Sequence, residues 1–289
     1  MKIFILIPIY NDWQSLEKLL EKINNTISNS NFEFSVIIVN DSSSEKQSLK
    51  ANNLNNLKSI KIINIKNNMG HGRCNAIGLK YIFENEKFDY VIPMDGDGED
   101  RPEEIKQFIN KIDKSLIIPI VGERVKRSEG PLFVFCYYIH KILTLAFTGR
   151  SIKFGNYTCL PKSIVEILIN EKATWSSFSG SLTKISHNKL VIPSIRGGRY
   201  FGPSKMSFKN LLVHSLAIIG VFKFNVLFRS ILFAIIYILA VIQNVSLITL
   251  IPLIALIIFV LSCFIISSRE KLNELKNSLS NITNIDNVK

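Results

Sequence analysis

The sequence predicts an α/β protein in which a mostly parallel sheet, covered by helices on both faces, is followed by amphipathic helices and a hairpin of two transmembrane helices. Three observations predict this architecture. Short apolar runs alternate with helical patterns through the first half of the chain, and strands that are apolar throughout belong to sheets buried on both faces. Residues 172–269 contain no Asp or Glu but ten Lys or Arg. Within that segment, two apolar stretches approach the ~20 residues that are needed to cross a bilayer.

The strands and helices of the first half are expected to alternate. The predicted strands cover residues 2–8, 34–40, 60–65, 90–94 and 116–121. The predicted helices cover residues 13–25, 71–84 and 102–112. The apolar run at the start of the first strand is too short for a signal peptide, and polar residues follow it at once. We therefore expect a buried strand there, and an amino-terminal domain that stays in the cytoplasm.

Two further helices, at 131–148 and 207–224, are rich in aromatic and aliphatic residues with few charges. Either one alone would be interpreted as an ordinary core helix. Because both lie near the basic, acid-free segment, we expect them to lie in the plane of a membrane interface.

The apolar stretches 226–242 and 246–267 are joined by a short polar link, Gln243-Asn244, and therefore predict a hairpin. Basic residues flank its two outer ends and are expected on the cytoplasmic side. These residues are Arg229, Arg269, Lys271 and Lys276. The alternative is a pair of helices buried in a soluble core.

Charge and cysteine content narrow the class of protein. The net charge of +12 and the basic segment beside apolar helices fit anionic lipid head groups or phosphate-bearing ligands. No nucleic-acid-binding motif accompanies the charge, so nucleic acid is not expected as a partner. The four cysteines stand far apart without a CxxC pair, which suits a reducing compartment and argues against a zinc knuckle.

The strongest candidate for chemistry is the sequence Asp-Gly-Asp-Gly-Glu-Asp-Arg-Pro, residues 95–102, directly after the fourth predicted strand. Ligands of parallel sheets bind beyond the carboxyl ends of the strands. Asp95 and Asp97, one residue apart at such an end, can share a hard cation that in turn holds a diphosphate. A solvated turn is the ordinary alternative for two carboxylates with this spacing.

Polar residues also follow the first three strands. Asp12 follows the first strand and Asp41 the second, and a carboxylate at these positions can bind a ribose or a base. Gly70 and Gly72 let the backbone approach a ligand at the start of a helix. Each feature alone could be turn chemistry, but four polar strand ends on one edge indicate a binding site.

At this point the sequence resembles glycosyltransferase family 2, and within it the dolichyl- or polyprenyl-phosphate glycosyltransferases, the group of dolichyl-phosphate mannose synthase. The resemblance covers nearly the whole chain, in order. The matching motifs are Pro8-Ile9-Tyr10-Asn11-Asp12, Asn40-Asp41-Ser42-Ser43, Asn68-Met69-Gly70, residues 95–103, Gly122-Glu123-Arg124 and Arg199-Tyr200-Phe201-Gly202-Pro203-Ser204-Lys205. Three positions depart from the family pattern, with Asn40 for Asp, Ser42 for Gly and Glu99 for the usual Gln.

The resemblance implies a GT-A-type, Rossmann-like fold and assigns roles to particular residues. Asp95, Asp97 and Glu99 are expected to hold Mg²⁺ or Mn²⁺. Donor contacts are expected from Pro8, Tyr10, Asp12, Asp41, Asn68, Gly70 and Gly96. Catalytic phosphate contacts are expected from Arg124, Arg199 and Lys205, with Arg127, Arg196 and Ser204 as further phosphate or acceptor ligands.

The function implied is inverting transfer of a sugar from a nucleotide-diphosphate sugar to a polyprenyl phosphate at the cytoplasmic face of the membrane. A lipid phosphate is already ionised and needs no general base, so His71 is interpreted as a helix-start residue. The alternatives are transfer to a hydroxyl, with Asp100 or Glu99 as the base, and a non-catalytic membrane scaffold.

The expected organisation is a cytoplasmic catalytic domain at 1–206, a juxtamembrane helix at 207–225, a transmembrane hairpin at 226–268 and a polar cytoplasmic tail at 269–289. The expected partners are the nucleotide sugar, the polyprenyl phosphate and membrane lipids, and a homo-oligomer is left open. We expect a multi-pass protein of the cytoplasmic membrane.

Overall fold

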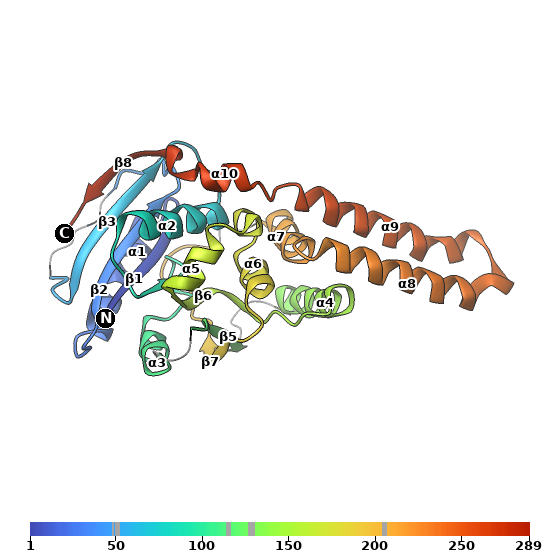
Figure 1. Ribbon diagram of the computed structural model, residues 1–289, viewed down its shortest axis with the longest axis horizontal. Coiled ribbons are helices and arrows are strands. Elements are labelled where there is room, and N and C mark those ends of the chain that lie inside the picture. Colours follow the sequence, from blue (N-terminus) through green and yellow to red (C-terminus); the bar gives the residue numbers. More distant parts are fainter. Residues whose placement is uncertain (48, 50–52, 114–116, 127–130, 204–206) are drawn as a thin grey trace.

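The computed structural model describes residues 1–289 except 48, 50–52, 114–116, 127–130 and 204–206. An α/β body lies at one end, and two long helices project from it side by side (Figure 1). The body is built on one sheet with the strand order β7-β5-β6-β4-β1-β2-β3-β8. Its strands are β1 Lys2–Ile9, β2 Glu33–Asn40, β3 Leu57–Ile65, β4 Tyr90–Pro93, β5 Ile120–Lys126, β6 Phe154–Pro161, β7 Leu190–Ile195 and β8 Ile282–Asn287.

The sheet is mostly parallel, as the sequence predicts. Strand β1 pairs in parallel with β2 and β4, β2 with β3, and β5 with β7. The pairs β3–β8, β4–β6 and β5–β6 are antiparallel. The parallel strands β1 to β4 therefore end at one common edge, where ligands of such sheets bind.

Helices cover both faces because the strand side chains alternate between two apolar cores. Ile5 and Ile7 of β1 pack into the core under α1 and α3, whereas Phe4 and Leu6 pack into the core under α2, α5 and α6. The covering helices are α1 Trp13–Thr26, α2 His71–Asn85, α3 Ile105–Asn110, α5 Lys162–Leu168 and α6 Phe178–Ile185. The short turns η1 Pro102–Glu104 and η2 Lys172–Trp175 complete the body.

The predicted elements up to α2 agree with the structure to within a few residues, and β4 follows as expected. The fifth strand lies at Ile120–Lys126 rather than at 116–121, and residue 116 is outside the described part of the chain. The sequence patterns indicate none of the last three strands. Strand β6 contains Gly155 and Asn156, β7 contains Pro193, and β8 is largely polar, so each lacks the apolar run used to recognise a strand.

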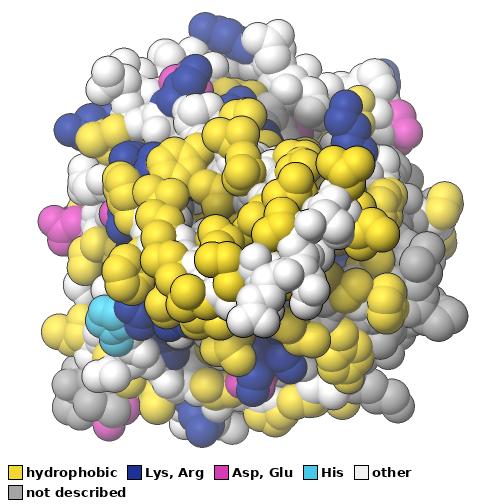
Figure 2. Space-filling model, turned by 90° about the vertical axis from the view of Figure 1, so that its right-hand side faces the viewer, with side chains coloured by type: hydrophobic (Ala, Val, Ile, Leu, Met, Phe, Trp, Pro, Cys, Tyr) yellow, Lys and Arg dark blue, Asp and Glu magenta, His cyan; other side chains and the backbone are white. Residues whose placement is uncertain are grey.

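The projecting helices are α8 Lys223–Val241, extended by η3 Ile242–Asn244, and α9 Leu247–Ser267. The membrane-length segments have mean hydropathies of 2.3 and 3.0, and only 11% and 6% of their most apolar windows are buried. A pair of core helices would instead be buried, so that alternative is wrong. Figure 2, which looks onto the tip of the hairpin, shows hydrophobic side chains across the centre with Lys and Arg around their margin. This arrangement indicates a membrane protein.

Two more helices, α4 Pro131–Thr148 and α7 Phe208–Gly220, pack at the base of the hairpin. The Phe147 ring of α4 lies 5.4 Å from that of Phe233 and 4.7 Å from that of Phe259. Arg229 Nη1 donates a hydrogen bond to the Ala146 carbonyl, at 3.1 Å. The side chain of Arg229 therefore caps the carboxyl end of α4. The base of the hairpin thus contacts that helix through both aromatic and polar side chains.

After the hairpin the chain returns to the body through α10 Leu272–Lys276 and the turn η4 Ser278–Asn281. Trp175 Nε1 donates to Glu274 Oε2 at 2.8 Å, and β8 then pairs antiparallel with β3. The sequence patterns treat 269–289 as a tail, but in the structure much of it packs on the body. The two outer ends of the hairpin therefore join the same body. The domain boundaries expected from the sequence stay a prediction.

Candidate active site

The candidate site lies at the carboxyl edge of the parallel strands, where two loops of opposite charge meet. Residues 95–101, here the acidic loop, follow β4, and residues 196–203, here the basic loop, follow β7. The turns after β1, β2 and β3 lie around them. The sequence places the acidic loop at this edge, but the position of the basic loop depends on β7, which the sequence patterns do not indicate.

The acidic loop is a compact turn in which two glycines pack closely against neighbouring residues. The backbone N–H of Asp95 donates to Asp100 Oδ2 at 2.9 Å, and that of Glu99 donates to Asp97 Oδ1 at 3.0 Å. Gly98 has a φ of +92°, and a Cβ there would lie 2.5 Å from the Tyr200 ring. A Cβ on Gly96 would lie 3.2 Å from the carbonyl oxygen of Pro8 in β1. Both glycines therefore permit close packing that any side chain would disturb.

His71, the first residue of α2, belongs to the site. Its Nε2 lies 2.9 Å from Asp95 Oδ1, and its Nδ1 lies 3.3 Å from Asn156 Nδ2. Burial alone would raise the pKa of Asp95, but the His71 imidazole, with Arg196 and Arg124, holds that pKa well below its usual range. Burial alone would lower the pKa of His71, but Asp95 raises it. His71 is thus a helix-start residue, as the sequence suggests, and in addition a partner of the acidic loop.

The basic loop lies directly on the acidic loop. Arg199 Nη1 donates to Asp97 Oδ2 at 2.5 Å, and Arg199 Nη2 donates to Asp12 Oδ2 at 2.6 Å. Arg196 pairs with the carboxylate of Glu99. These side chains are mostly buried, so the contacts lie in a partly desolvated environment.

Backbone hydrogen bonds fix the register of the two loops. The N–H of Gly197 donates to the Glu99 carbonyl at 2.8 Å, and the N–H of Tyr200 donates to the Asp97 carbonyl at 2.9 Å. The Tyr200 ring lies over Gly98, with Lys18 and Lys22 Nζ at 5.2 and 4.7 Å from its centroid. Arg196 and Arg199 are therefore presented to the carboxylates by a backbone that is itself held in place.

The turns predicted to bind the donor come together at the start of α2. The Asp41 carboxylate accepts hydrogen bonds from the N–H groups of Met69, at 2.6 Å, and Gly70, at 2.9 Å. Asn68 Nδ2 donates to the Asp41 carbonyl at 3.2 Å. Gly70 has a φ of +87°, a backbone conformation that glycine adopts without strain. Asp41 thus organises the turn that begins α2, a role that the sequence alone did not suggest.

Three more predicted residues differ in their surroundings. Pro8 is buried within β1, so it shapes the sheet edge rather than presenting a side chain to solvent. Tyr10, at the end of β1, is 43% exposed and offers a ring to a ligand. The Arg124 guanidinium of β5 lies over Gly155, where a Cβ would come within 2.9 Å of it. The positive charge of Arg124 lowers the pKa values of Asp95 and Asp100.

The predicted ligands Arg127, Ser204 and Lys205 lie outside the described residues.

The residues of the acidic loop suit a divalent cation. Asp95 Oδ1 is buried and accepts no well-aligned hydrogen bond from the described residues, although His71 Nε2 lies nearby. Burial and the Asp95 charge raise the pKa of Asp97, and they raise that of Asp100 to about 7. Crowded carboxylate oxygens that repel one another are a set that Mg²⁺ or Mn²⁺ would stabilise.

In the described part of the chain no group of three acidic, His or Cys residues is arranged around a common point. Asp95 and Asp97 would therefore share such an ion with substrate phosphates. The predicted third ligand, Glu99, is paired with Arg196.

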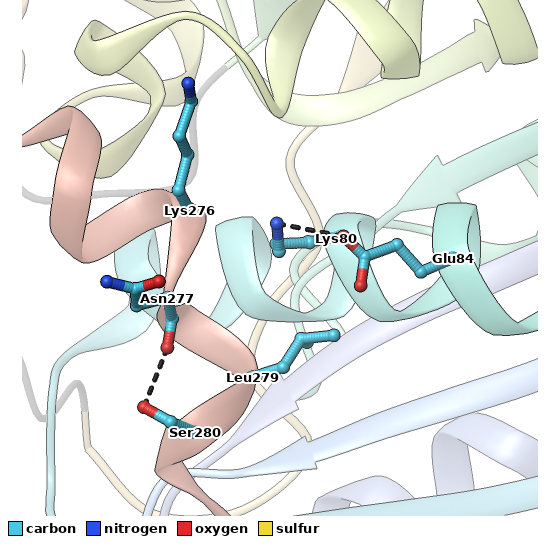
Figure 3. A pocket seen from close by; sticks show the side chains of 6 residues that line it. All are labelled: Lys80, Glu84, Lys276, Asn277, Leu279 and Ser280. Carbon is cyan, nitrogen blue, oxygen red and sulfur yellow. Dashed lines mark hydrogen bonds and ion pairs between the residues drawn. The ribbon is translucent and has the colours of Figure 1, made fainter.

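A surface hollow of about 440 Å³ lies elsewhere, between α2 and the segment after α9 (Figure 3). Its lining residues are Lys80, Glu84, Lys276, Asn277, Leu279 and Ser280. Lys80 and Glu84 lie toward the carboxyl end of α2 and form an ion pair at 2.9 Å, whereas His71 begins that helix at the candidate site. The hollow therefore lies away from the acidic loop, and we assign it no part in the candidate site.

Several residues that hold the site together carry no recognisable signal in the sequence. Glu104, Ser194, Asn156 and Tyr157 all make hydrogen bonds next to the two loops. Glu104 follows the acidic motif by only a few residues, and an acidic residue at the start of a helical turn normally suggests nothing more than helix stabilisation. Its partners come from β7, so no local signal could have revealed its contacts.

Comparison with known proteins shows the family and the fold of the chain. A profile of glycosyl transferase family 2 matches residues 4–155. The chain is similar to two proteins named undecaprenyl-phosphate 4-deoxy-4-formamido-L-arabinose transferase. The one from Proteus mirabilis is 26% identical over 219 residues, covering 73% of this chain and 64% of the relative. The one from Photorhabdus laumondii is 29% identical over 219 residues, covering 73% of this chain and 65% of the relative. The chain thus spans just under two thirds of the length of these relatives.

Solved structures share the fold at low sequence identity. Glucosyl-3-phosphoglycerate synthase from Mycobacterium tuberculosis, in complex with Mn²⁺, UDP-glucose and phosphoglyceric acid, has a TM-score of 0.54 at 10% identity, with 78% of this chain and 79% of that chain covered. A mannosyltransferase from Pyrobaculum calidifontis, in complex with GDP-Man and Mn²⁺, has a TM-score of 0.50 at 13% identity, with 96% and 86% covered. At these identities the likeness concerns the fold alone.

Proposed function

The chain belongs to glycosyl transferase family 2, and we propose that it transfers a sugar from a nucleotide-diphosphate sugar to a polyprenyl phosphate at the cytoplasmic face of a membrane. The observation that carries the proposal is the meeting of the acidic and basic loops at the carboxyl edge of the sheet, on a body that continues into an exposed apolar hairpin. The names of the curated relatives, which act on undecaprenyl phosphate, support the acceptor.

On this proposal the acidic loop handles the donor diphosphate. Asp95 and Asp97 hold Mg²⁺ or Mn²⁺, which when bound supplies positive charge to the leaving nucleotide diphosphate. Asp12, Asp41, Asn68 and the exposed Tyr10 ring surround the nucleoside. The fold likeness to nucleotide-sugar enzymes is consistent with this placement.

The basic loop supplies charge to phosphate oxygens. Arg199 Nε is buried and makes no hydrogen bond with any residue that the structure describes. A phosphate oxygen is an acceptor that would satisfy this donor, and a charge-assisted bond to phosphate is stronger than a neutral one. On this proposal Arg124, Arg199 and Lys205 neutralise phosphates during transfer. The further phosphate or acceptor ligands are Arg127, Arg196 and Ser204.

The chemical step needs no general base. An oxygen of the lipid phosphate, whose second pKa is near 6, attacks the anomeric carbon from the face opposite the leaving group. The bond from that carbon to the donor diphosphate breaks, the nucleotide diphosphate leaves with the electron pair, and the configuration inverts.

A hydroxyl acceptor would require a base, and the two carboxylates suggested for that role are both engaged. Glu99 pairs with Arg196. Asp100 is only 4% exposed, and its Oδ2 accepts the Asp95 N–H. Each carboxylate would have to leave these contacts to act as a base, whereas a lipid phosphate needs no base, and this difference favours the lipid phosphate.

The hairpin places the site at the membrane on this proposal. Both outer ends of the hairpin join the body through α7 and α10, and the exposed aromatic and aliphatic side chains of α4, such as Tyr138 and Ile142, continue its apolar surface. The body and its donor site then lie on the cytoplasmic side, where the basic residues concentrate.

To test this proposal, the purified protein is incubated with a panel of radiolabelled nucleotide sugars, a short-chain polyprenyl phosphate and Mg²⁺ or Mn²⁺. The lipids are then extracted and their radioactivity is counted. We expect one sugar to enter the lipid fraction, and the label to stay in the aqueous phase with Asp97→Asn. Label on a lipid lacking the phosphate would favour the hydroxyl acceptor. Absence of metal-dependent nucleotide binding would favour the non-catalytic scaffold.

A further inference from the structure

Glu104 is a buried carboxylate that joins the roots of the two loops. Its side chain is 3% exposed. Glu104 Oε2 accepts a hydrogen bond from Ser194 Oγ at 2.7 Å, and Oε1 accepts one from the backbone N–H of Ile195 at 2.8 Å. Ser194 and Ile195 are the last two residues of β7, and Arg196 follows directly.

Glu104 is also fixed on its own side. It ends the turn η1, which follows the acidic loop, and its N–H donates to the Arg101 carbonyl at 3.1 Å. That carbonyl also accepts a hydrogen bond from Tyr157 Oη at 2.7 Å. The carboxylate therefore connects a rigid part of the acidic-loop segment to the point at which the basic loop leaves the sheet.

Stability alone does not explain a carboxylate at this position. Burying an ionised carboxylate costs free energy, and an apolar side chain of similar size would often be as stable. Glu104 has no ion pair among those of the described residues, so hydrogen bonds rather than a cation satisfy it. An apolar side chain could not supply two hydrogen-bond acceptors that point at the end of β7.

We propose that Glu104 is a positioning residue for sugar transfer. By holding Ser194 and Ile195, it fixes the start of the basic loop and so sets where the guanidinium groups of Arg196 and Arg199 stand over the acidic loop. The inference rests on the proposed function for its catalytic part. It lies beyond the motif residues, which end at Glu103 in the sequence resemblance.

The first measurement tests the positioning directly and needs no turnover. Hydrogen–deuterium exchange of the peptide that contains Gly197 and Tyr200 reports on their N–H bonds to the acidic loop. We expect exchange there to be about tenfold faster or more in Glu104→Ala. Glu104→Gln should exchange like the wild type, because its amide can still accept from Ile195 and donate to Ser194 Oγ.

The second measurement follows transfer to a short-chain polyprenyl phosphate. Misplaced groups that act in the transition state lower kcat, so Glu104→Ala should lose about tenfold to a hundredfold in kcat with a donor KM within about threefold of wild type. Glu104→Gln should keep more than about a third of the turnover. Ser194→Ala, which removes one of the two hydrogen bonds, should fall between them.

A matched control separates positioning from folding. Glu86 is another largely buried carboxylate, held by Lys61 Nζ at 2.6 Å, and it follows the carboxyl end of α2, away from the loops. Glu86→Ala should lower the melting temperature without speeding exchange in the peptide that contains Gly197 and Tyr200, and without slowing turnover. In an Arg199→Ala background, Glu104→Ala should add little to the loss of turnover, because both changes remove the same guanidinium contact.

The outcomes are distinguishable. Unchanged exchange at Gly197 and Tyr200 in Glu104→Ala, or faster exchange with wild-type turnover, would overturn the positioning role. Failure of Glu104→Gln to restore turnover would do the same. If the wild type itself transfers no sugar to lipid phosphate, the proposed function fails, while the exchange measurement still decides whether Glu104 holds the loop.

Discussion

Replacing Arg199 with Ala should strengthen divalent-metal binding and weaken sugar transfer at the same time. The Arg199 guanidinium, whose side chain is 14% exposed, donates to Asp97 at 2.5 Å and to Asp12 at 2.6 Å. It therefore occupies a carboxylate that we assign to the metal. A divalent cation that binds Asp97 has to share or displace this internal cation.

The magnitudes follow from the two contacts. A hydrogen bond to a charged group contributes about 1.5–3 kcal/mol. If the metal has to break the hydrogen bond between Arg199 and Asp97 in order to bind, binding loses about 1.5 kcal/mol of free energy. The Arg199→Ala variant has no such bond to break, so it should bind the metal roughly tenfold more tightly. Without metal, Arg199→Ala leaves two carboxylates unpaired in a mostly buried site, which should cost about 3 kcal/mol of stability. In transfer, loss of a phosphate contact of about 3 kcal/mol should slow turnover roughly a hundredfold.

The assay is titration of Mn²⁺ into detergent-purified protein without nucleotide, with free Mn²⁺ measured by electron paramagnetic resonance. Asp97→Asn should abolish the binding and serves as the control. Turnover is measured separately with saturating metal and a short-chain polyprenyl phosphate. Equal or weaker Mn²⁺ binding by Arg199→Ala would refute the competition, and turnover above about a third of wild type would refute the phosphate contact.

Three further predictions concern other parts of the structure. Asp95→Asn and Asp97→Asn should each abolish transfer with a folded protein, checked by circular dichroism, and near-normal turnover at saturating metal would exclude the metal assignment. An accessible tag at Gln243 should react only from the non-cytoplasmic side and one after Lys276 only from the cytoplasm; labelling of both from one side would contradict the hairpin. Burial raises the pKa of Asp100 to about 7, so the folded, metal-free protein holds a proton that the unfolded chain releases near about pH 4. Stability should therefore fall as pH rises from about 4 to about 7. Asp100→Asn should reduce this fall, measured by thermal unfolding at about pH 5 and about pH 8, and an unchanged pH dependence would contradict the assignment.

The first part of the fold could be predicted because its signals are local. Strands β1 to β4 are apolar runs, and α1 and α2 begin directly after polar turns. The common carboxyl edge could therefore be predicted from the alternation of strands and helices. The hydrogen bonds of the Asp41 carboxylate to the backbone of Met69 and Gly70 could not. Strands β6, β7 and β8 could not be predicted, since each is specified by its neighbours in the sheet and carries Gly, Pro or polar residues.

The same distinction separates the parts of the site. Asp95 and Asp97 could be predicted as site residues because only Gly96 separates them and they follow a strand. The pairing of Arg199 with Asp97 and Asp12 joins residues 102 and 187 positions apart, and Glu104 meets Ser194 across 90 positions. Contacts of that kind depend on the path of the chain through β7. Sequence motifs predicted that Arg199 binds phosphate but could not show that it pairs with Asp97 and Asp12.

The eighth strand has a consequence for biosynthesis. Asn64 of β3 donates a hydrogen bond to Asp286 of β8, 222 residues later, and the whole hairpin lies between them. The sheet thus receives its outermost strand only after both apolar helices have been made, so the body can be completed only after synthesis of the hairpin. Long-range pairing of this kind forms late in folding. A fragment cut before the hairpin would leave the outer edge of β3 unpaired, and an open edge of this type invites aggregation. A water-soluble version of the body would need β8 rejoined by a linker in place of the hairpin.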